Sequence, residues 1–397
     1  CLNGFQLNKK CYTVYCDRKK KSGGINGMLK KFSVENFKNF KNKLELDLTS
    51  GKYTFNNQAL YNNVIKNSVL YGINGSGKSN LTYAIMDITT HLTDFTRQEK
   101  HYSPYLNIDS DLKYAEFSYE FIFGDDKVIY RYKKESVSEV YDEIVIINDE
   151  TVILEDYKNN YRYVTLKGAE NLDVFGRDKS LSFIKYIFRN TKLDFNNQVN
   201  ILFKQFIEFV EGMLYFGSGT FEGNIYQGLK SSRERISTAL INSEKLDQFE
   251  RFLEESHIHY SLEAGKDDEG GDIINVVFDK NKVNFLSVAS HGTKVLMVFF
   301  YWLLQVDKIK FLVVDEFDAF YHNEVAINLL SKIIKESTQS LFTTHNTSIM
   351  SNDLLRPDCY FLIQNNKINN LPSLTVKELR FAHNLEKMYN AGAFNDR

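Results

Sequence analysis

The chain has 397 residues, of which 43% are hydrophobic and 25% charged, and its formal net charge is −2 at pH 7. This composition is that of a globular protein with room for two or three packed units. The longest apolar stretch, residues 295–306, is too short to span a membrane and predicts a buried core helix. No signal peptide is visible, so we expect a cytoplasmic protein.

The first 27 residues differ in charge and composition from the rest. They carry six Lys or Arg against one Asp, a net +5, which leaves −7 for the residues that follow. Three of the four cysteines, Cys1, Cys11 and Cys16, lie here without the paired spacing of a zinc site, so no metal site is expected. We interpret residues 1–27 as a non-native or disordered basic extension ahead of a start at Met28. The alternative is a genuine basic tail.

Residues 28–174 predict an N-terminal lobe rich in strands. Apolar and polar residues alternate at its start and again in its second half, and a Gly-rich stretch followed by helical spacing separates the two. The elements expected here are a β-hairpin over 28–48 with its turn at 38–42, a buried strand at 64–70, a helix at 80–92 and a β-rich subdomain over 115–166.

Residues 175–262 change to helical spacing and predict an inserted helical lid. Its first helix places Leu202, Phe206, Phe209 and Met213 on one face. Strands and helices then alternate again, which favours a mostly parallel sheet. The C-terminal lobe is expected to span 263–397, with strands at 272–279, 311–314 and 340–343 and the apolar helix of 295–306.

The stretch YGINGSGKSN, residues 71–80, matches the pattern G-x-x-x-x-G-K-[ST] between an apolar strand and a helix. The glycines let backbone N–H groups curl around a phosphate, Lys78 reaches the β- and γ-phosphates, and the Ser79 hydroxyl binds Mg²⁺. The following helix offers its positive end to the anion. We therefore predict that a nucleoside triphosphate is held by Gly72, Asn74, Gly75, Ser76, Gly77, Lys78, Ser79 and Asn80.

Two other strand ends carry residues that suit phosphoryl chemistry. The run FLVVDEFDAF delivers Asp315 and Glu316 at the end of an apolar strand. Asp315 is expected to support Mg²⁺, and Glu316 to act as a general base toward water. A second apolar run, SLFTTHN, places His345 at a matching edge. We predict catalytic roles for Glu316, His345 and Lys78.

A second anion site is predicted ahead of the long apolar helix. Ser290, Gly292 and Thr293 are small residues at its start, where backbone N–H groups are free to bind an anion. One chain needs a single phosphate loop, so we expect this site to serve a nucleotide held by another copy of the protein. The alternative is a simple N-cap provided by Ser290.

The order of these motifs resembles the ABC-type ATPase head in its RecF/OLD/SMC-like branch, from residue 28 to about 394. The resemblance implies an α/β P-loop NTPase with a mostly parallel core sheet, an antiparallel β subdomain and the inserted lid. It also implies two heads that sandwich ATP and Mg²⁺, with Ser290 and Gly292 on the partner copy's γ-phosphate. His345 would sense the γ-phosphate, and Asp318 would lie in a loop that contacts the opposite subunit. The sequence S-H-G-T replaces the transporters' L-S-G-G-Q, which disfavours transport.

Local similarity in FSVENFKNF, FTTHNTSIMS and ELRFAHNLEKMYNAGAF extends to bacterial phage-defence ATPases of the RloA/AbiL type. AriA of PARIS and PtuA of Septu are similar heads. This resemblance implies an ATP-driven homodimeric or larger switch that controls a separately encoded nuclease of the Toprim or HNH type. The alternative is a RecF-like DNA-repair ATPase that clamps DNA. DNA binding is possible in either case, but the acidic balance after residue 27 does not favour it.

Three further features refine the hypothesis. No N-K-x-D motif is present, so ATP is favoured over GTP. Phe37, Lys38 and Phe40 either flank the base or form a turn with buried aromatics. Gln98 is the nearest candidate for the glutamine that ABC heads place on Mg²⁺, although it follows no clear strand. The acidic triplet at 109–111 lies in a polar loop, so no fused nuclease is expected.

Overall fold

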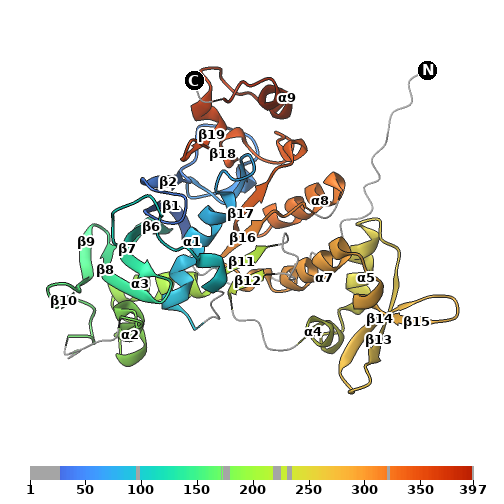
Figure 1. Ribbon diagram of the computed structural model, residues 1–397, viewed down its shortest axis with the longest axis horizontal. Helices are drawn as coiled ribbons and strands as arrows, with labels where there is room; N and C mark the ends of the chain where they lie inside the picture. Colours follow the sequence, from blue (N-terminus) through green and yellow to red (C-terminus); the bar gives the residue numbers. More distant parts are fainter. Residues whose placement is uncertain are drawn as a thin grey trace.

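The computed structural model describes residues 27–94, 99–170, 172, 179–217, 225–229, 235–319 and 322–395. They form two seven-stranded sheets, one three-stranded sheet and a two-stranded ribbon, with helices between and beside them (Figure 1). Residues 1–26 and Gln98 lie outside the described residues, so the predictions for the basic extension and for this glutamine stay predictions.

The mostly parallel sheet forms the centre of the molecule (Figure 1). Its strands are β5 (Asn67–Tyr71), β11 (Met213–Gly217), β12 (Ile225–Gly228), β16 (Phe311–Asp315), β17 (Gln339–Thr344), β18 (Tyr360–Gln364) and β19 (Lys367–Asn370). Their order is β12-β11-β16-β17-β5-β18-β19, and the five inner strands run parallel. Every residue of β5, β11, β16 and β17 is buried, which explains their apolar runs. The predicted parallel sheet is confirmed.

The strand predicted at 64–70 is divided in the structure. Val64 and Ile65 form β4 (Val64–Ile65), which pairs with β3 (Leu60–Tyr61), and β5 begins after Lys66. Lys66 bends away and donates hydrogen bonds to the carbonyl groups of Ile334 and Glu336. The polar residue inside the apolar run marks this break.

The second seven-stranded sheet is antiparallel throughout, in the order β10-β9-β8-β7-β6-β1-β2. Its strands are β1 (Gly27–Glu35), β2 (Leu44–Asp47), β6 (Ala115–Phe123), β7 (Asp126–Ser136), β8 (Glu139–Ile147), β9 (Glu150–Asp156) and β10 (Tyr161–Val164). The pairing of β1 with β2 confirms the predicted hairpin, and β6 to β10 confirm the β-rich subdomain. Buried residues alternate along β6 because one face meets helices.

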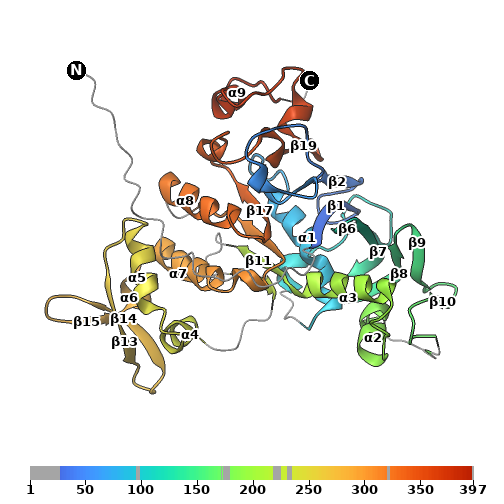
Figure 2. The same cartoon turned by 180° about the vertical axis from the view of Figure 1, so that it is seen from behind.

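Two helices, α1 (Lys78–Leu92) and α3 (Gln198–Glu211), connect the sheets (Figures 1 and 2). α1 contacts α3, β11, β12 and β16, and α3 contacts β1, β6, β7 and β8. A fully buried ion pair joins α1 to β7, with Lys134 Nζ 2.9 Å from the Asp87 carboxylate. The hydroxyl groups of Tyr105 and Tyr132 also donate to this carboxylate. Because a buried charge is stable only when paired and hydrogen-bonded, the cluster fixes α1 in place.

The helical lid predicted for residues 175–262 is not confirmed. α2 (Phe183–Asn190) and α3 belong to the layer against α1 and the antiparallel sheet, and residues 213–217 form β11 of the core sheet. Three members of the predicted apolar helix face are buried on α3, but Met213 is a strand residue. The residues of β11 pair with β12 on one side and β16 on the other. This pairing makes the segment a strand, although its apolar spacing predicts a helix. The domain boundaries after 174 and 262 stay predictions.

A smaller unit surrounds the beginning of the long apolar helix and lies at the right of Figure 1. It contains α4 (Ile236–Asn242), α5 (Leu246–Glu254), β13 (Ser261–Lys266), β14 (Asp272–Val277), β15 (Lys282–Asn284), α6 (Phe285–Val288) and α7 (His291–Leu303). α4 and α5 contact α7, and α6 contacts β14 and β15. Almost all of α7 is buried, so the predicted core helix is confirmed, although it begins at His291.

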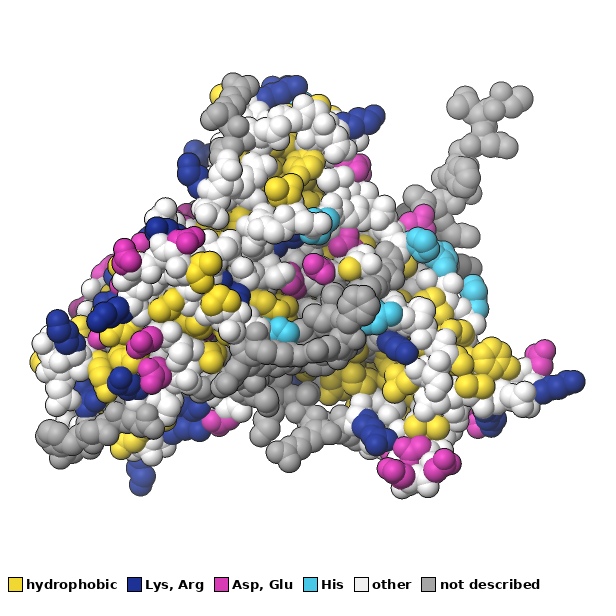
Figure 3. All heavy atoms as spheres, in the orientation of Figure 1, with side chains coloured by type: hydrophobic (Ala, Val, Ile, Leu, Met, Phe, Trp, Pro, Cys, Tyr) yellow, Lys and Arg dark blue, Asp and Glu magenta, His cyan; other side chains and the backbone are white. Residues whose placement is uncertain are grey.

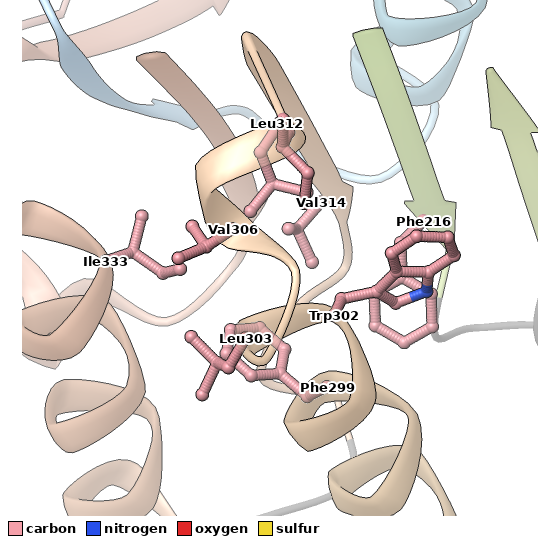
Figure 4. Close-up of a pocket in the computed structure, with 9 residues that line it drawn as sticks. Phe216, Phe299, Trp302, Leu303, Val306, Leu312, Val314 and Ile333 are labelled. Atoms are coloured by element: carbon pink, nitrogen blue, oxygen red, sulfur yellow. The ribbon is translucent and has the colours of Figure 1, made fainter. Parts of the chain in front are cut away.

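A small apolar cavity lies where α7 meets the core sheet and α8 (Asn323–Ile334) (Figure 4). Its volume is about 10 Å³, which is at the lower limit for one water molecule. Phe216, Trp302 and Leu312 are among its lining residues, all of which are apolar. With this size and lining, the cavity is a packing void and not a ligand site.

The C-terminal residues, which include α9 (Leu385–Asn390), contact the N-terminal lobe through a buried ion pair that binds its backbone. Arg356 and Asp358 lie 2.7 Å apart, and both bind the backbone of Gly51. Within the described ranges, no helix is long and apolar enough to cross a membrane.

Candidate functional site

The Gly-rich loop joins β5 to α1 in a tight turn. A Cβ atom on Gly72 would stand 2.4 Å from Ser76 Oγ and 2.6 Å from Ile363 Cγ2, so glycine is required there. Gly75 and Gly77 have φ angles of +77° and +100°, which other residues rarely adopt. α1 begins directly after Gly77, so the N–H groups of its first turn are available to an anion.

Lys78 is only 6% exposed, and its ammonium group folds over the loop. Nζ donates to the Gly72 carbonyl at 2.8 Å and lies 2.7 Å from Nε2 of His345. Burial lowers the pKa of Lys78, and burial together with the neighbouring Lys78 charge lowers the pKa of His345. His345 is therefore neutral at pH 7, and its Nε2 accepts a hydrogen bond from the ammonium group. The structure thus brings together two predicted catalytic residues, Lys78 at the start of α1 and His345 just after β17.

Asp315 is the last residue of the buried strand β16 and Glu316 follows it, so the two acids stand at the strand end as the sequence predicts. The Asp315 carboxylate accepts hydrogen bonds from the Thr343 hydroxyl and, at 3.4 Å, from the Tyr215 hydroxyl. The backbone N–H of Glu316 donates to the same Thr343 hydroxyl at 2.9 Å. Glu316 has a φ of +50°, a left-handed conformation that costs energy in a residue with a side chain. Contacts with the neighbouring strand therefore hold Glu316 in place against its local preference.

The environment of Glu316 suits a proton acceptor. Burial and the adjacent Asp315 charge raise the pKa of Glu316, whereas Lys78 opposes this shift. A carboxylate with a raised pKa is a stronger base, provided that it remains ionised at the working pH. Glu316 can therefore accept a proton from water more readily than an exposed glutamate.

The loop after Glu316 is tied to the end of β17. The Thr344 hydroxyl donates to the Asp318 carboxylate at 2.8 Å and accepts from the backbone N–H of Asn346 at 2.8 Å. Thr344, the residue before His345, thus holds the Asp318 side chain near the end of β17. These bonds give the predicted subunit-contacting loop a defined conformation in a single chain.

An open cavity of about 430 Å³ lies among these groups. Figure 3 shows acidic side chains gathered with histidine near the centre of the molecule on this side. The cavity is lined by Asn74, Glu316, Asp318, Ala319, His345 and Asn346.

The residues present fit a nucleoside triphosphate with Mg²⁺. In the described part of the chain, the buried Ser76 Oγ in the loop has no hydrogen-bond partner, so it is available to a ligand. Lys78 supplies the cation, the loop supplies N–H donors, and Ser79 and Asp315 supply the oxygen atoms that Mg²⁺ prefers. The volume of the cavity is ample for the phosphate groups.

The predicted second anion site lies outside this cavity. Ser290 caps α7, since its side chain accepts a hydrogen bond from the Thr293 N–H at 3.2 Å. Ser290 is exposed, whereas Gly292 and Thr293 are buried, and none of the three lines the cavity. The N-cap is confirmed as local structure, and the role toward another copy stays a prediction.

The aromatic turn of Phe37 and Phe40 lies beneath the Gly-rich loop. Both rings are fully buried, and Phe37 packs against the edge of Tyr105. Of the two alternatives for this turn, the structure favours buried aromatics over a base-stacking surface. Asn39 accepts a hydrogen bond from the Asn80 side chain at 2.7 Å and so supports the first turn of α1.

Sequence reasoning missed several residues that hold the site. Thr343 and Thr344 were visible as polar residues in the otherwise apolar run SLFTTHN, and buried polar residues need partners. Asn346 follows them after His345. Tyr215 carried no signal, because it lies in a segment whose spacing was interpreted as helical.

A strand, a Gly-rich loop and a helix, with two acidic residues at the end of a nearby parallel strand, define a P-loop nucleoside triphosphatase. Residues 68–351, more than half of the chain, match the family described as "AAA domain, putative AbiEii toxin, Type IV TA system". The chain belongs to this family.

Solved structures of SMC heads are similar at low identity. The SMC head domain from Thermotoga maritima has 15% identity and a TM-score of 0.41, over 86% of this chain and 98% of that one. An SMC head bound to the C-terminal winged-helix domain of ScpA has 16% identity and a TM-score of 0.44, over 87% and 98%. A head from Pyrococcus furiosus, bound to the C-terminal domain of ScpA, has 14% identity and a TM-score of 0.46, over 87% and 96%. No curated protein matches the sequence.

Replacing Thr343 by Val is expected to slow nucleotide hydrolysis about tenfold or more. The change keeps the shape of the side chain but removes the hydroxyl that holds both Asp315 and the Glu316 backbone. Loss of these bonds is also expected to lower the free energy of unfolding by about 1–3 kcal/mol. Phosphate release and thermal unfolding measure the two effects.

Thr338→Val is the matched control for this change. The Thr338 hydroxyl is buried and donates to the carbonyl groups of Val306 and Ile309, outside the cavity. We expect it to lower stability while leaving hydrolysis close to that of the wild type. Equal losses of activity in the two variants would show that Thr343 has only a general structural role.

Proposed function

We propose that this protein is an ATP-hydrolysing switch of a bacterial anti-phage defence system, in which two copies close on ATP and control a separately encoded nuclease. The observation that carries the proposal is the contact of Lys78 with His345 beside the cavity that His345 and Glu316 line, while Ser290 stays exposed outside it. One chain thus presents a phosphate site and, separately, a helix start suited to another copy's phosphate.

The residues have distinct roles in hydrolysis. Lys78 binds the β- and γ-phosphates, and Glu316 accepts a proton from the attacking water. Ser79 and Asp315 would hold Mg²⁺, which when bound neutralises charge on the phosphates. His345, neutral beside Lys78, is placed to exchange its hydrogen bond with Lys78 for one with the γ-phosphate. That exchange would make the strand end at His345 sensitive to the presence of ATP.

The defence role rests on family relationship and local sequence. The family description names a putative toxin of a type IV toxin–antitoxin system. The resemblance to ATPases of the RloA/AbiL type, and to the AriA and PtuA heads, supports a switch that acts through a Toprim-type or HNH nuclease. The Asp-Ser-Asp stretch at 109–111 lies in the loop that precedes β6 and not at a strand end of the sheet, which supports a separately encoded effector.

The surface charge does not favour a DNA clamp. On the face shown in Figure 3, Lys and Arg side chains are interspersed with Asp and Glu and do not gather in a groove. A duplex-binding surface needs several cations in a row to contact successive phosphates.

The proposal is tested by co-purification. We would express the Glu316→Gln variant together with its neighbouring gene, purify it in ATP and Mg²⁺, and identify by mass spectrometry what stays bound. We expect a dimer with a stoichiometric nuclease, and the loss of the bound nuclease in a Lys78→Met variant. A bare dimer that carries DNA would favour the RecF-like clamp, and a monomer without a partner would contradict the switch.

A further inference from the structure

Tyr215 is a residue from a third strand that contacts Asp315, the carboxylate proposed to hold Mg²⁺. It lies on β11, beside β16, and its side chain is only 1% exposed. Its hydroxyl is 3.4 Å from Oδ2 of Asp315 and 3.4 Å from the hydroxyl of Tyr83, which is on α1 one turn after Ser79. The phenol therefore stands between Asp315 and the helix that carries Ser79.

The register of the sheet explains how the phenol reaches the carboxylate. β11 runs parallel to β16, and Gly217 is paired with Asp315. Tyr215 is two residues before Gly217, so its side chain is on the same face as that pair. A Cβ on Gly217 would stand 2.8 Å from the Tyr215 hydroxyl. The glycine thus leaves the space through which the ring extends toward Asp315.

The two oxygens of Asp315 are held from opposite sides of β16. The Thr343 hydroxyl, on β17, donates to Oδ1, and the Tyr215 hydroxyl, on β11, donates to Oδ2. Together the two donors restrain rotation of the carboxylate. A carboxylate with a fixed orientation loses less freedom when it binds a metal ion or a metal-bound water.

We infer that Tyr215 is a positioning residue for Asp315, and that with Gly217 it sets the affinity of the nucleotide site for its divalent cation. This inference rests on the proposed nucleotide site and deepens it. Tyr215 acts through Asp315 and does not itself contact phosphate or metal. Tyr83 completes the link, since its ring packs against Tyr215 at 5.4 Å between centroids and its backbone belongs to α1.

The test compares Mn²⁺ binding in the wild type and in Tyr215→Phe. Free Mn²⁺ is followed by electron paramagnetic resonance while the protein is titrated in the presence of ADP. We expect the dissociation constant for Mn²⁺ to rise about three- to tenfold, the size expected for one lost hydrogen bond. ADP affinity measured in EDTA is expected to stay unchanged, because the phosphate loop is not altered.

Two further variants separate positioning from general packing. Tyr360→Phe removes a buried hydroxyl of the same core sheet that donates to the carbonyl groups of Ile349 and Ser351, so it should leave Mn²⁺ affinity unchanged. Gly217→Ala keeps the phenol but displaces it, and should weaken Mn²⁺ binding in the same direction, even if Tyr215→Phe proves too unstable to purify.

Unchanged Mn²⁺ affinity in the Tyr215 and Gly217 variants would overturn the inference. An equal loss in Tyr360→Phe would also overturn it, because the effect would then be one of stability. A wild-type protein that binds neither ADP nor Mn²⁺ would instead refute the proposed function, so the two failures are distinguishable.

Discussion

Replacing Glu316 by Gln is expected to lower the rate of ATP hydrolysis by about 100- to 10,000-fold, the contribution of a positioned general base. Gln has nearly the same shape but cannot take a proton from water. ATP affinity should be retained, because the phosphate loop and Lys78 are untouched. Single-turnover hydrolysis and equilibrium ATP binding, measured on the same preparation, separate the two effects.

The same change should not destabilise the fold. In the native protein the pKa of Glu316 is raised above the ordinary 4.5, so its ionised form is disfavoured by folding. The stability that this group contributes is present below pH 4.5 and is lost as the pH rises through the raised pKa. Gln therefore removes a small penalty at pH 7, and a rise in Tm on the order of 1 °C is expected after solvent screening. The gain should vanish at pH 4.

A remote carboxylate provides the control for Glu316→Gln. Glu150 is exposed at the start of β9, far along the chain from the cavity residues, and Glu150→Gln should leave hydrolysis unchanged. Substantial ATP hydrolysis by Glu316→Gln would remove Glu316 from the role of base and leave the catalytic assignment to another group.

Mixing two inactive variants, Lys78→Met and Ser290→Arg, is expected to restore hydrolysis to roughly a quarter of the wild-type rate. The hydrolysis rate of each variant alone should fall below about one hundredth of the wild-type rate. Every site in its dimer then lacks either the phosphate-binding cation or the facing helix start. In a mixed dimer, one site takes Lys78 from one copy and Ser290 from the other and is intact. Half of the dimers are mixed, and half of their sites work.

The matched control mixes Lys78→Met with Glu316→Gln. Within a single chain, Lys78 contacts His345, which lines the same cavity as Glu316, so no pairing of these copies produces an intact site. Activity should stay at the level of the single variants. Recovery in this mixture, or none in the Lys78 and Ser290 mixture, would contradict sites shared between copies. Ser290→Arg also removes an N-cap worth about 1 kcal/mol, so thermal unfolding must confirm that it folds.

Local patterns were enough to identify the parts of the nucleotide site. Each of three segments can be predicted from about ten consecutive residues. They are the Gly-rich loop, the apolar strand that ends at Asp315, and the strand that leads to His345. Because parallel strands present their carboxyl ends at one edge of a sheet, these short signals also imply that the three segments meet. The structure confirms this arrangement, with Lys78 and His345 2.7 Å apart.

The segment around Met213 shows where such patterns fail. Its apolar residues continue the helical spacing of α3, and nothing local distinguishes another helical turn from a buried strand. The difference arises from β16 and β12, which lie elsewhere in the sequence and supply hydrogen-bonded partners on both sides. The same pairing places Tyr215 beside Asp315, so a wrong local assignment also concealed a residue of the site.

The sequence by itself determined the parts of the candidate site: a Gly-rich loop of the phosphate-binding type, two carboxylates and a histidine at strand ends, and an apolar helix with a capped start. These depend on residue type and on spacing within one element, which the chain carries locally. The tertiary structure alone decided that β11 enters the core sheet, that Phe37 and Phe40 are buried, and that Thr343 and Tyr215 hold Asp315. Those outcomes depend on contacts between residues far apart in sequence, whose energies are set only when the sheets and helices pack together.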